Sequence, residues 1–149
     1  MRTIVFGSDH AGFTLKALLK EHVGGGREII DVGTHSLDSC DYPRFAADLA
    51  REVLARQALG ILICGSGIGV SVTANRFPGI RAALCANEYM ARMSRMHNDA
   101  NVLCMGERII GVDLAKSIAD AFLGTAFEGG RHQRRVDLID TISQNPCAR

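Results

Sequence analysis

The sequence is poor in aromatic side chains and in net charge. Tryptophan is absent, aromatic residues make up 5% of the 149 residues, and 17 basic residues nearly balance 16 acidic ones, for a formal charge of +1. A surface that stacks nucleic-acid bases needs aromatic side chains, and one that binds polyanions needs an excess of basic side chains. We therefore expect no nucleic-acid partner.

The sequence also lacks a long apolar run and the cysteine spacing of a zinc site. No stretch approaches the length of a membrane span, and the chain runs from its start into an apolar segment without a signal-peptide pattern. Its five cysteines form no Cys-x-x-Cys pair and have no close histidine partner in the sequence. They are Cys40, Cys64, Cys85, Cys104 and Cys147. We expect a reducing, cytoplasmic setting, no membrane partner and no zinc site.

What the sequence does contain is an alternation of strand-like and helix-like segments, with 47% apolar residues. Apolar runs cover residues 3–7, 28–32, 59–64, 80–85 and 102–106, and helical periodicity covers residues 11–22, 42–56, 70–75, 87–96, 112–123 and 133–143. This order predicts an α/β fold, in which helices cover both faces of a parallel sheet and ligands bind at the carboxyl ends of the strands. A chain of this length fits one domain, which we assign to residues 1–149.

The most informative motif is the glycine loop Cys64-Gly65-Ser66-Gly67-Ile68-Gly69, which joins the third apolar run to a helical segment. Glycine at every second position lets the backbone approach a ligand closely, and the amides at the start of a helix favour negative charge. The loop therefore predicts an anion site that carries a thiol and a hydroxyl. The spacing is neither a dinucleotide fingerprint nor a P-loop, and a tight turn with a buried cysteine is the alternative.

Two polar residues, Asp9 and His10, follow the first apolar run. The carboxyl ends of parallel strands share one edge of the sheet, so we expect both side chains to lie near the glycine loop. The alternatives are that Asp9 caps the next helix and that His10 is a solvated loop residue.

A second polar group, His97-Asn98-Asp99, ends the fourth helical segment just before the run 102–106. Such a junction lies at the amino ends of the strands, on the opposite edge from the glycine loop. Either the helix extends past the sheet, or His97 serves a site on a neighbouring subunit. Histidine and asparagine also suit a helix C-terminus without any further role.

Several arginines form a third group. Arg108 follows the end of the last strand, and Arg131, Arg134 and Arg135 lie just after the glycine pair 129–130. Arginine is usually solvated, but its planar guanidinium makes bidentate contacts with phosphate, which is the ligand that the glycine loop predicts.

The last helical segment has an apolar face, with Val136, Leu138, Ile139 and Ile142, and no strand follows it. The face could pack on the sheet of its own chain or on another subunit. We favour a symmetric contact with a partner subunit.

We expect no part in the chemistry for two further groups of residues. We expect Lys16 and Lys20 to lie on a solvated helix face. Cys85, Cys104 and Met105 should pack in the core.

Five motifs, in this order along the chain, closely resemble the ribose-5-phosphate isomerase B family, which includes allose-phosphate and galactose-phosphate isomerases. They are Gly7-Ser8-Asp9-His10-Ala11-Gly12, Asp41-Tyr42-Pro43, Cys64-Gly65-Ser66-Gly67-Ile68-Gly69, Arg95-Met96-His97-Asn98-Asp99 and Glu128-Gly129-Gly130-Arg131-His132. The resemblance covers essentially the whole chain. It implies a Rossmann-like three-layer α/β/α fold with a five-stranded parallel sheet, no metal or other cofactor, and a homodimer or dimer of dimers with shared active sites.

The resemblance also implies a role for each matching residue. Cys64 would be the base that moves a proton between C1 and C2 of the sugar, and Ser66, where many members have threonine, would hydrogen-bond the reacting oxygens. His97 would help to open the furanose ring, and Asp9 would bind or relay protons at the ring oxygens. The implied substrate contacts are the amides of Gly65, Ser66, Gly67, Ile68 and Gly69 for the enediolate, His10, Arg108, Arg131 and Arg135 for the phosphate, Asn98 for a sugar hydroxyl, and Tyr42.

The predicted activity is the interconversion of ribose 5-phosphate and ribulose 5-phosphate, a reaction of the pentose phosphate pathway. Moving a carbonyl from C1 to C2 requires a base and fixed donors for the oxyanion, and Cys64 and its loop offer both. Allose 6-phosphate, galactose 6-phosphate or a tetrose phosphate are alternative substrates, because small differences in substrate size change specificity modestly. Two other classes are a nucleotide-binding module with an inert Cys64 and a thiol redox protein, which would lack a nearby resolving cysteine.

Overall fold

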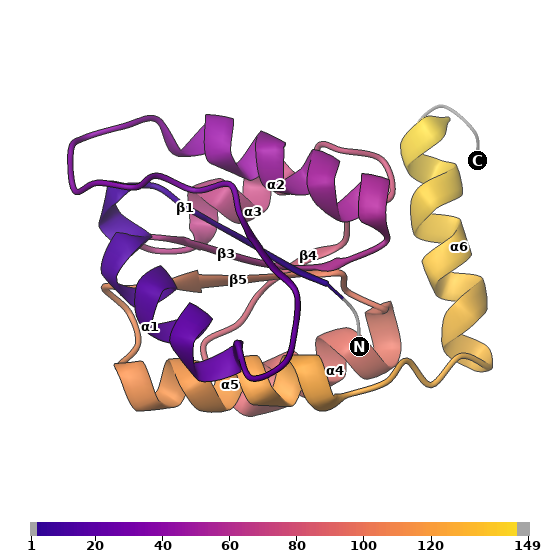
Figure 1. The fold of residues 1–149 in the computed structure, drawn as a ribbon. Helices are drawn as coiled ribbons and strands as arrows, with labels where there is room; N and C mark the ends of the chain where they lie inside the picture. Colours follow the sequence, from indigo (N-terminus) through magenta and orange to yellow (C-terminus); the bar gives the residue numbers. More distant parts are fainter. Residues whose placement is uncertain (1–2, 146–149) are drawn as a thin grey trace.

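The computed structural model describes residues 3–145, which form a five-stranded parallel sheet between two layers of helices (Figure 1). The strands follow the order β2-β1-β3-β5-β4, and every neighbouring pair is parallel. They are β1 (Ile4–Ser8), β2 (Ile29–Asp31), β3 (Leu59–Cys64), β4 (Ala82–Leu84) and β5 (Val102–Gly106). The helices are α1 (Phe13–Val23), α2 (Tyr42–Arg56), α3 (Ile68–Ala74), α4 (Glu88–Asn98), α5 (Val112–Gly124) and α6 (Arg131–Gln144), and a 3-10 turn, η1 (His10–Gly12), precedes α1.

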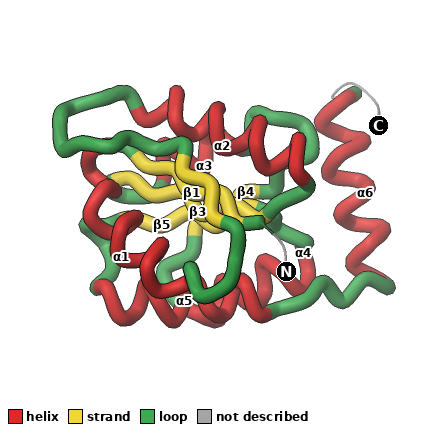
Figure 2. Tube along the Cα trace, in the orientation of Figure 1, coloured by secondary structure: helices red, strands yellow, loops and turns green. Residues whose placement is uncertain are grey.

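The central strands β3 and β5 are apolar at every position because they face two separate cores. Ile61 and Ile63 of β3 pack with residues of α1 and α5 in one core, whereas Leu62 and Cys64 pack with residues of α2 and α3 in the other. Successive side chains of a strand point to opposite faces, so a strand that is covered on both sides reads as an unbroken apolar run. Figure 2 shows the resulting three layers, with the strands between helices. The predicted α/β/α sandwich is confirmed.

The predicted limits of the strands agree best with the structure in the centre of the sheet. β3, β5 and α2 have the predicted limits, whereas the edge strands β2 and β4, which pair on one side, are shorter than the runs 28–32 and 80–85. Asp41 occupies the N-cap position of α2 without a side-chain cap hydrogen bond, and Pro43 lies in the first turn, where its missing N–H costs nothing.

The prediction that Lys16 is solvated is wrong. Its side chain is 2% exposed, and its Nζ donates to Asp31 Oδ1 at 2.8 Å and to the carbonyl oxygen of Thr34 at 2.7 Å. Lys20 is partly exposed and donates to the other carboxylate oxygen of Asp31 at 2.6 Å. The apolar stem of Lys16 lies on the covered face of α1, and its ammonium group reaches the carboxylate at the end of β2. The expected burial of Cys85, Cys104 and Met105 is confirmed.

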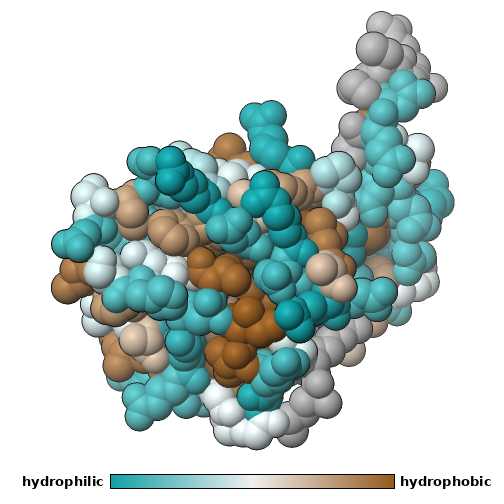
Figure 3. Space-filling view, turned by 45° about the horizontal axis from the view of Figure 1, so that its top comes forward, coloured by the Kyte–Doolittle hydropathy of each residue, from teal (hydrophilic) through white to brown (hydrophobic). Residues whose placement is uncertain are grey.

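Helix α6 lies at the edge of the molecule, beyond the amino ends of the strands (Figure 1). On the face shown in Figure 3, it rises at the right, away from the central apolar patch. Val136 is buried, but Leu138, Ile139 and Ile142 are about half exposed. These apolar side chains do not make α6 a membrane helix, since no helix in residues 3–145 is long and apolar enough to cross a bilayer. The packing of α6 on a partner subunit stays a prediction.

Candidate active site

The glycine loop begins where β3 ends, at the carboxyl edge of the sheet. Cys64 is the last residue of β3 and pairs in register with Gly106, the last residue of β5. The side chain is almost covered, with 5% of the residue exposed, and its Sγ accepts a hydrogen bond from the N–H of Gly67 at 3.1 Å. The predicted base therefore lies beneath the loop with a backbone amide directed at its sulfur atom.

The conformation of this loop requires glycine at position 67. Gly67 has a φ of +78°, and a Cβ there would lie 2.5 Å from Leu84 Cδ1 and 2.8 Å from the carbonyl carbon of Met105. Both the left-handed backbone and the close packing exclude a side chain. The hydroxyl of Ser66 accepts a hydrogen bond from the N–H of Ile68 at 3.3 Å. The predicted anion donors are thus gathered in one turn at the start of α3.

Asp9 and His10 lie at the same edge of the sheet, after β1. Asp9 is buried, and its Oδ1 accepts hydrogen bonds from the N–H groups of Ala11 at 3.0 Å and Gly12 at 3.2 Å, so it caps η1. This cap was the alternative for Asp9, and Oδ2 makes no hydrogen bond within residues 3–145.

His10 is held by the long loop that connects β2 to α2, seen at the left of Figure 2. Its Nδ1 accepts a hydrogen bond from the N–H of Cys40 at 3.2 Å, and the Cys40 Sγ lies 3.8 Å away. Because Nδ1 is the acceptor, a neutral His10 carries its proton on Nε2, where it can be donated to an anion. Cys40 was missed, since the two residues are 30 positions apart in the sequence and leave no local signal of this contact.

Arg108 and Tyr42 flank the glycine loop. The backbone N–H of Arg108 donates to the carbonyl of Gly65 at 3.0 Å, and a Cβ on Gly65 would lie 3.4 Å from Arg108 Nη1. A Cβ on Gly69 would lie 3.0 Å from the hydroxyl oxygen of Tyr42. Glu107, which the sequence analysis missed, accepts a hydrogen bond from the backbone of α1 at 2.9 Å and ties the end of β5 to that helix. One edge of the sheet thus assembles a thiol, amide donors, an imidazole, a guanidinium and a phenol.

Two other buried cysteines have a different environment from Cys64. Burial raises the pKa of Cys85 to about 11, partly offset by a hydrogen bond with Ser94. Burial, with added repulsion from Cys85 and Cys64, raises the pKa of Cys104 far above its ordinary value. Both groups remain neutral thiols at neutral pH, in agreement with a packing role.

The remaining predicted residues lie at the opposite edge of the sheet. His97 and Asn98 end α4, and Arg131 and Arg135 lie on α6. The end of α4 is next to the starts of β1 and β3, because Arg95 and Asp99 line one cavity with Ile4 and Leu59. The six residues of β3 span about 16 Å, so a single chain separates His97 from Cys64 by the length of the sheet.

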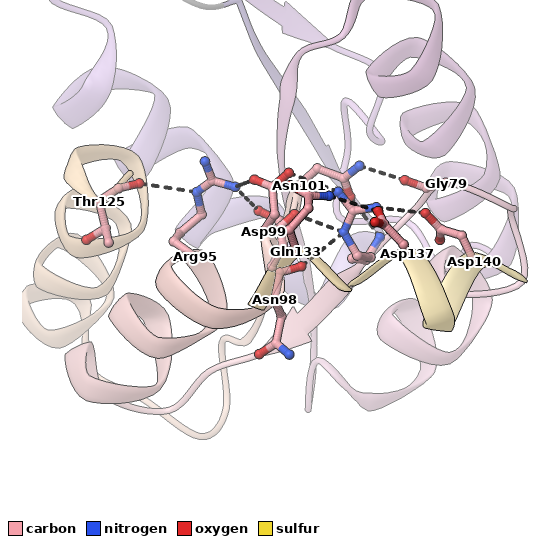
Figure 4. Close-up of polar contacts among 11 residues, drawn as sticks. Gly79, Arg95, Asn98, Asp99, Asn101, Thr125, Gln133, Asp137 and Asp140 are labelled. Carbon is pink, nitrogen blue, oxygen red and sulfur yellow. Dashed lines mark hydrogen bonds and ion pairs between the residues drawn. The ribbon is translucent and has the colours of Figure 1, made fainter. Parts of the chain in front are cut away.

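Charged contacts hold the end of α4 in place (Figure 4). Asp99 accepts from Arg95 Nη1 at 2.9 Å and from Arg81 Nη2 at 3.1 Å, and Arg81 Nη1 lies 3.5 Å from Asp140 of α6. In Figure 4 the side chain of Asn98 points away from this network. Asn98 is exposed and is therefore positioned for an outside contact.

His97 also has a partner on α6. Its ring stacks on that of His132, with centroids 4.3 Å apart and planes 13° from parallel. Burial, followed by the nearby charges of His97 and Arg131, lowers the pKa of His132, which favours the neutral ring. His132 belongs to the fifth motif, but its sequence context predicted no role for it. Among the described residues, His97, Glu128 and His132 also place possible metal ligands near one another.

Comparison with known proteins identifies the family. Residues 4–139 match the model of the ribose/galactose isomerase family. The chain belongs to this family. The ribose-5-phosphate isomerase B of Escherichia coli strain K12 is 51% identical over 146 residues, which are 97% of this chain and 98% of that protein. A probable ribose-5-phosphate isomerase B of Mycoplasma genitalium is 44% identical over 140 residues, covering 91% of this chain and 92% of the relative.

The solved structures of ribose/galactose isomerase relatives extend the agreement to the fold. That of Clostridium thermocellum ribose-5-phosphate isomerase B is 49% identical in sequence and superposes with a TM-score of 0.94, covering 97% of this chain and 99% of the other. The predicted family resemblance and the Rossmann-like architecture are both confirmed.

Proposed function

We propose that this chain, as one domain over residues 1–149, interconverts ribose 5-phosphate and ribulose 5-phosphate in the cytoplasm without a cofactor. The observation that carries the proposal is the position of Cys64, whose sulfur lies under an amide-rich turn at the carboxyl edge of the sheet. Relatives of more than 40% identity that are named ribose-5-phosphate isomerase B support the choice of substrate.

The reaction needs one base and a set of fixed donors. With the sugar open, the Cys64 thiolate removes the proton from C2, and the electron pair moves into the C1 carbonyl to form an enediolate. Amides of residues 65–69 donate to its oxygens, and Ser66 or the free oxygen of Asp9 passes the hydroxyl proton from O2 to O1. The Cys64 thiol then returns its proton to C1, which leaves a carbonyl at C2.

The remaining residues act in ring opening and substrate binding, and we propose that a second copy of the chain supplies several of them. His97 would open the furanose ring, Asn98 would bind a sugar hydroxyl, and Arg131 and Arg135 would bind the phosphate. The length of β3 between Cys64 and the end of α4 supports a site shared between two subunits. The exposed apolar side chains of α6 supply a surface for a homodimer or a dimer of dimers.

The experiment compares catalytic efficiencies of the purified chain on a panel of sugar phosphates. We expect the highest kcat/KM with ribose 5-phosphate and lower values with allose 6-phosphate, galactose 6-phosphate and a tetrose phosphate. Cys64→Ala should lower kcat by roughly a hundredfold to ten-thousandfold, which is the usual contribution of a general base. Cys85→Ala, a matched loss of another buried thiol, should keep kcat close to the native value. Near-native isomerisation by Cys64→Ala would remove Cys64 from the role of base.

A further inference from the structure

A group of potential metal ligands lies at the junction of α4 and α6, away from the glycine loop. His97 ends α4, His132 lies in the first turn of α6, and Glu128 precedes that helix. One ligand atom from each side chain can be chosen so that all three lie within 4.8 Å of one another. The group contains no cysteine, so the cysteine spacing that argues against a zinc site does not bear on it, although the family resemblance implies no metal.

The imidazole of His132 has a buried nitrogen that no hydrogen bond uses. Its side chain is 8% exposed, and Nε2 has no hydrogen-bond partner among the described residues. Glu128 Oε2 lies 3.4 Å from this nitrogen, close enough for an ion pair but without hydrogen-bond geometry. A buried polar atom without a partner is costly, so its lone pair is available to a ligand.

The distances are compatible with a tetrahedral ion after a small adjustment. In a tetrahedral site, metal–ligand bonds of about 2.0 Å place neighbouring ligand atoms roughly 3.3 Å apart. Glu128 Oε2 and His132 Nε2 are already 3.4 Å apart. His97 must move closer and tilt, because its ring is nearly parallel to that of His132 and a ring nitrogen binds in the ring plane. His97 is partly exposed and has room for this movement.

Backbone hydrogen bonds already place two of the three ligands. The N–H of Glu128 donates to the carbonyl of Met96 at 3.1 Å, which holds Glu128 beside the last turn of α4. The N–H of His132 donates to the carbonyl of Gly129 at 3.0 Å, which fixes the start of α6. Little chain entropy remains to be lost when an ion binds.

We propose that His97, Glu128 and His132 bind a divalent transition-metal ion, with Zn²⁺ as the best match. Two imidazoles and one carboxylate suit Zn²⁺, whereas Mg²⁺ and Ca²⁺ prefer all-oxygen ligands. The positive charges of Arg131 and Arg135 on the same turn oppose a cation, so we expect reversible binding that is weaker than in a structural zinc site. One consequence depends on the proposed function. A metal ion bound to His97 should inhibit isomerisation, because this side chain is then not available for ring opening.

The direct test is a titration of the full chain with Zn²⁺ in a phosphate-free buffer, read against a competing chromogenic chelator. We expect one site in the native chain and at least about tenfold weaker binding in Glu128→Gln, which loses a ligand charge at an exposed position. The matched control is Glu88→Gln, which removes the same charge at the far end of α4 and should bind like the native chain. Equal affinity in Glu128→Gln and the native chain, or no binding by either, would overturn the site.

Co²⁺ provides a second measurement that reports the ligands. Visible absorption of a four- or five-coordinate ion without a sulfur-to-metal charge-transfer band is the expected spectrum. A charge-transfer band would place the ion on a cysteine, such as Cys40 beside His10, and would overturn the assignment.

The inhibition is measured separately, with ribose 5-phosphate as substrate. Zn²⁺ should inhibit the native chain, and Glu128→Gln should need at least about tenfold more Zn²⁺ for the same inhibition. Equal inhibition of both chains would show that the ion acts elsewhere. A chain that binds Zn²⁺ at this site but has no isomerase activity would contradict the proposed function and leave the metal site intact.

Discussion

Cys64 differs from Cys85 and Cys104 in what surrounds its sulfur atom. The sulfur of Cys64 faces a backbone amide at the edge of the sheet, whereas the other two thiols are held neutral by burial. Sequence reasoning could separate them, because Cys64 begins a glycine loop and the other two follow ordinary core patterns. It could not place Cys40 beside His10, since the contact depends on how the loop 32–41 crosses the end of β1.

This difference predicts that iodoacetamide modifies Cys64 faster than Cys85. With a pKa of about 11, Cys85 has roughly one thiolate in ten thousand at pH 7, so iodoacetamide should leave it unmodified. Peptide mass spectrometry should show modification of Cys64 that ribose 5-phosphate slows at least about tenfold, because the bound sugar covers the sulfur. Nucleotides should give no protection. Modification of Cys85 at the same rate as Cys64, or protection by nucleotides, would contradict this prediction.

At the scale of elements, the order of strands and helices was predictable because the buried strands are mostly apolar and each helix has one apolar face. The role of Lys16 was not predictable, because helical spacing shows which residues share a face but not what lies opposite. Here the opposite residue is Asp31, at the end of the edge strand β2. A buried ion pair therefore connects α1 to β2, although the sequence pattern of α1 placed Lys16 on a solvated face.

The structure predicts that Lys16→Met destabilises the fold by about 2 kcal/mol at pH 7, because the change leaves the Asp31 carboxylate, whose side chain is 12% exposed, with one cation fewer. Burial alone would raise the pKa of Asp31, but hydrogen bonds from Lys16, Lys20 and Gly33 outweigh it and lower the pKa. A lowered pKa contributes stability above the ordinary value of 3.8, and this contribution is lost as the pH falls through the folded-state value.

Urea unfolding at several pH values between 7 and 3 measures both effects. The native chain should lose more stability across this range than Lys16→Met, since the variant has already lost part of the ion-pair contribution. Lys20→Met is the control, because Lys20 is more exposed, and we expect a loss of about 0.5 kcal/mol. Equal losses in the two variants would contradict the special role of Lys16.

At the scale of the whole molecule, two of the predicted catalytic residues, His97 and Cys64, lie far apart in a single chain. Because α4 runs back toward the amino ends of the strands, His97 had to lie away from Cys64, and the structure has the two residues at opposite edges. Family resemblance suggested that subunits share the site, and the exposed apolar side chains of α6 are consistent with that suggestion. Neither the partner nor its orientation can be derived from one chain, because intrachain contacts do not specify the symmetry of an assembly.

A shared site predicts that two inactive variants restore each other. Cys64→Ala and His97→Asn each damage both sites of their own dimer. A mixed dimer instead combines both changes in one site and leaves the other site with a native Cys64 and a native His97. If mixing after dissociation is random, half of the dimers are mixed and activity should recover to about a quarter of the native value. The measurement is the turnover of ribose 5-phosphate before and after exchange of subunits, with each variant exchanged against itself as the control. If Cys64 and His97 act within one chain, mixing restores nothing, because every chain in the mixture then carries a damaged site.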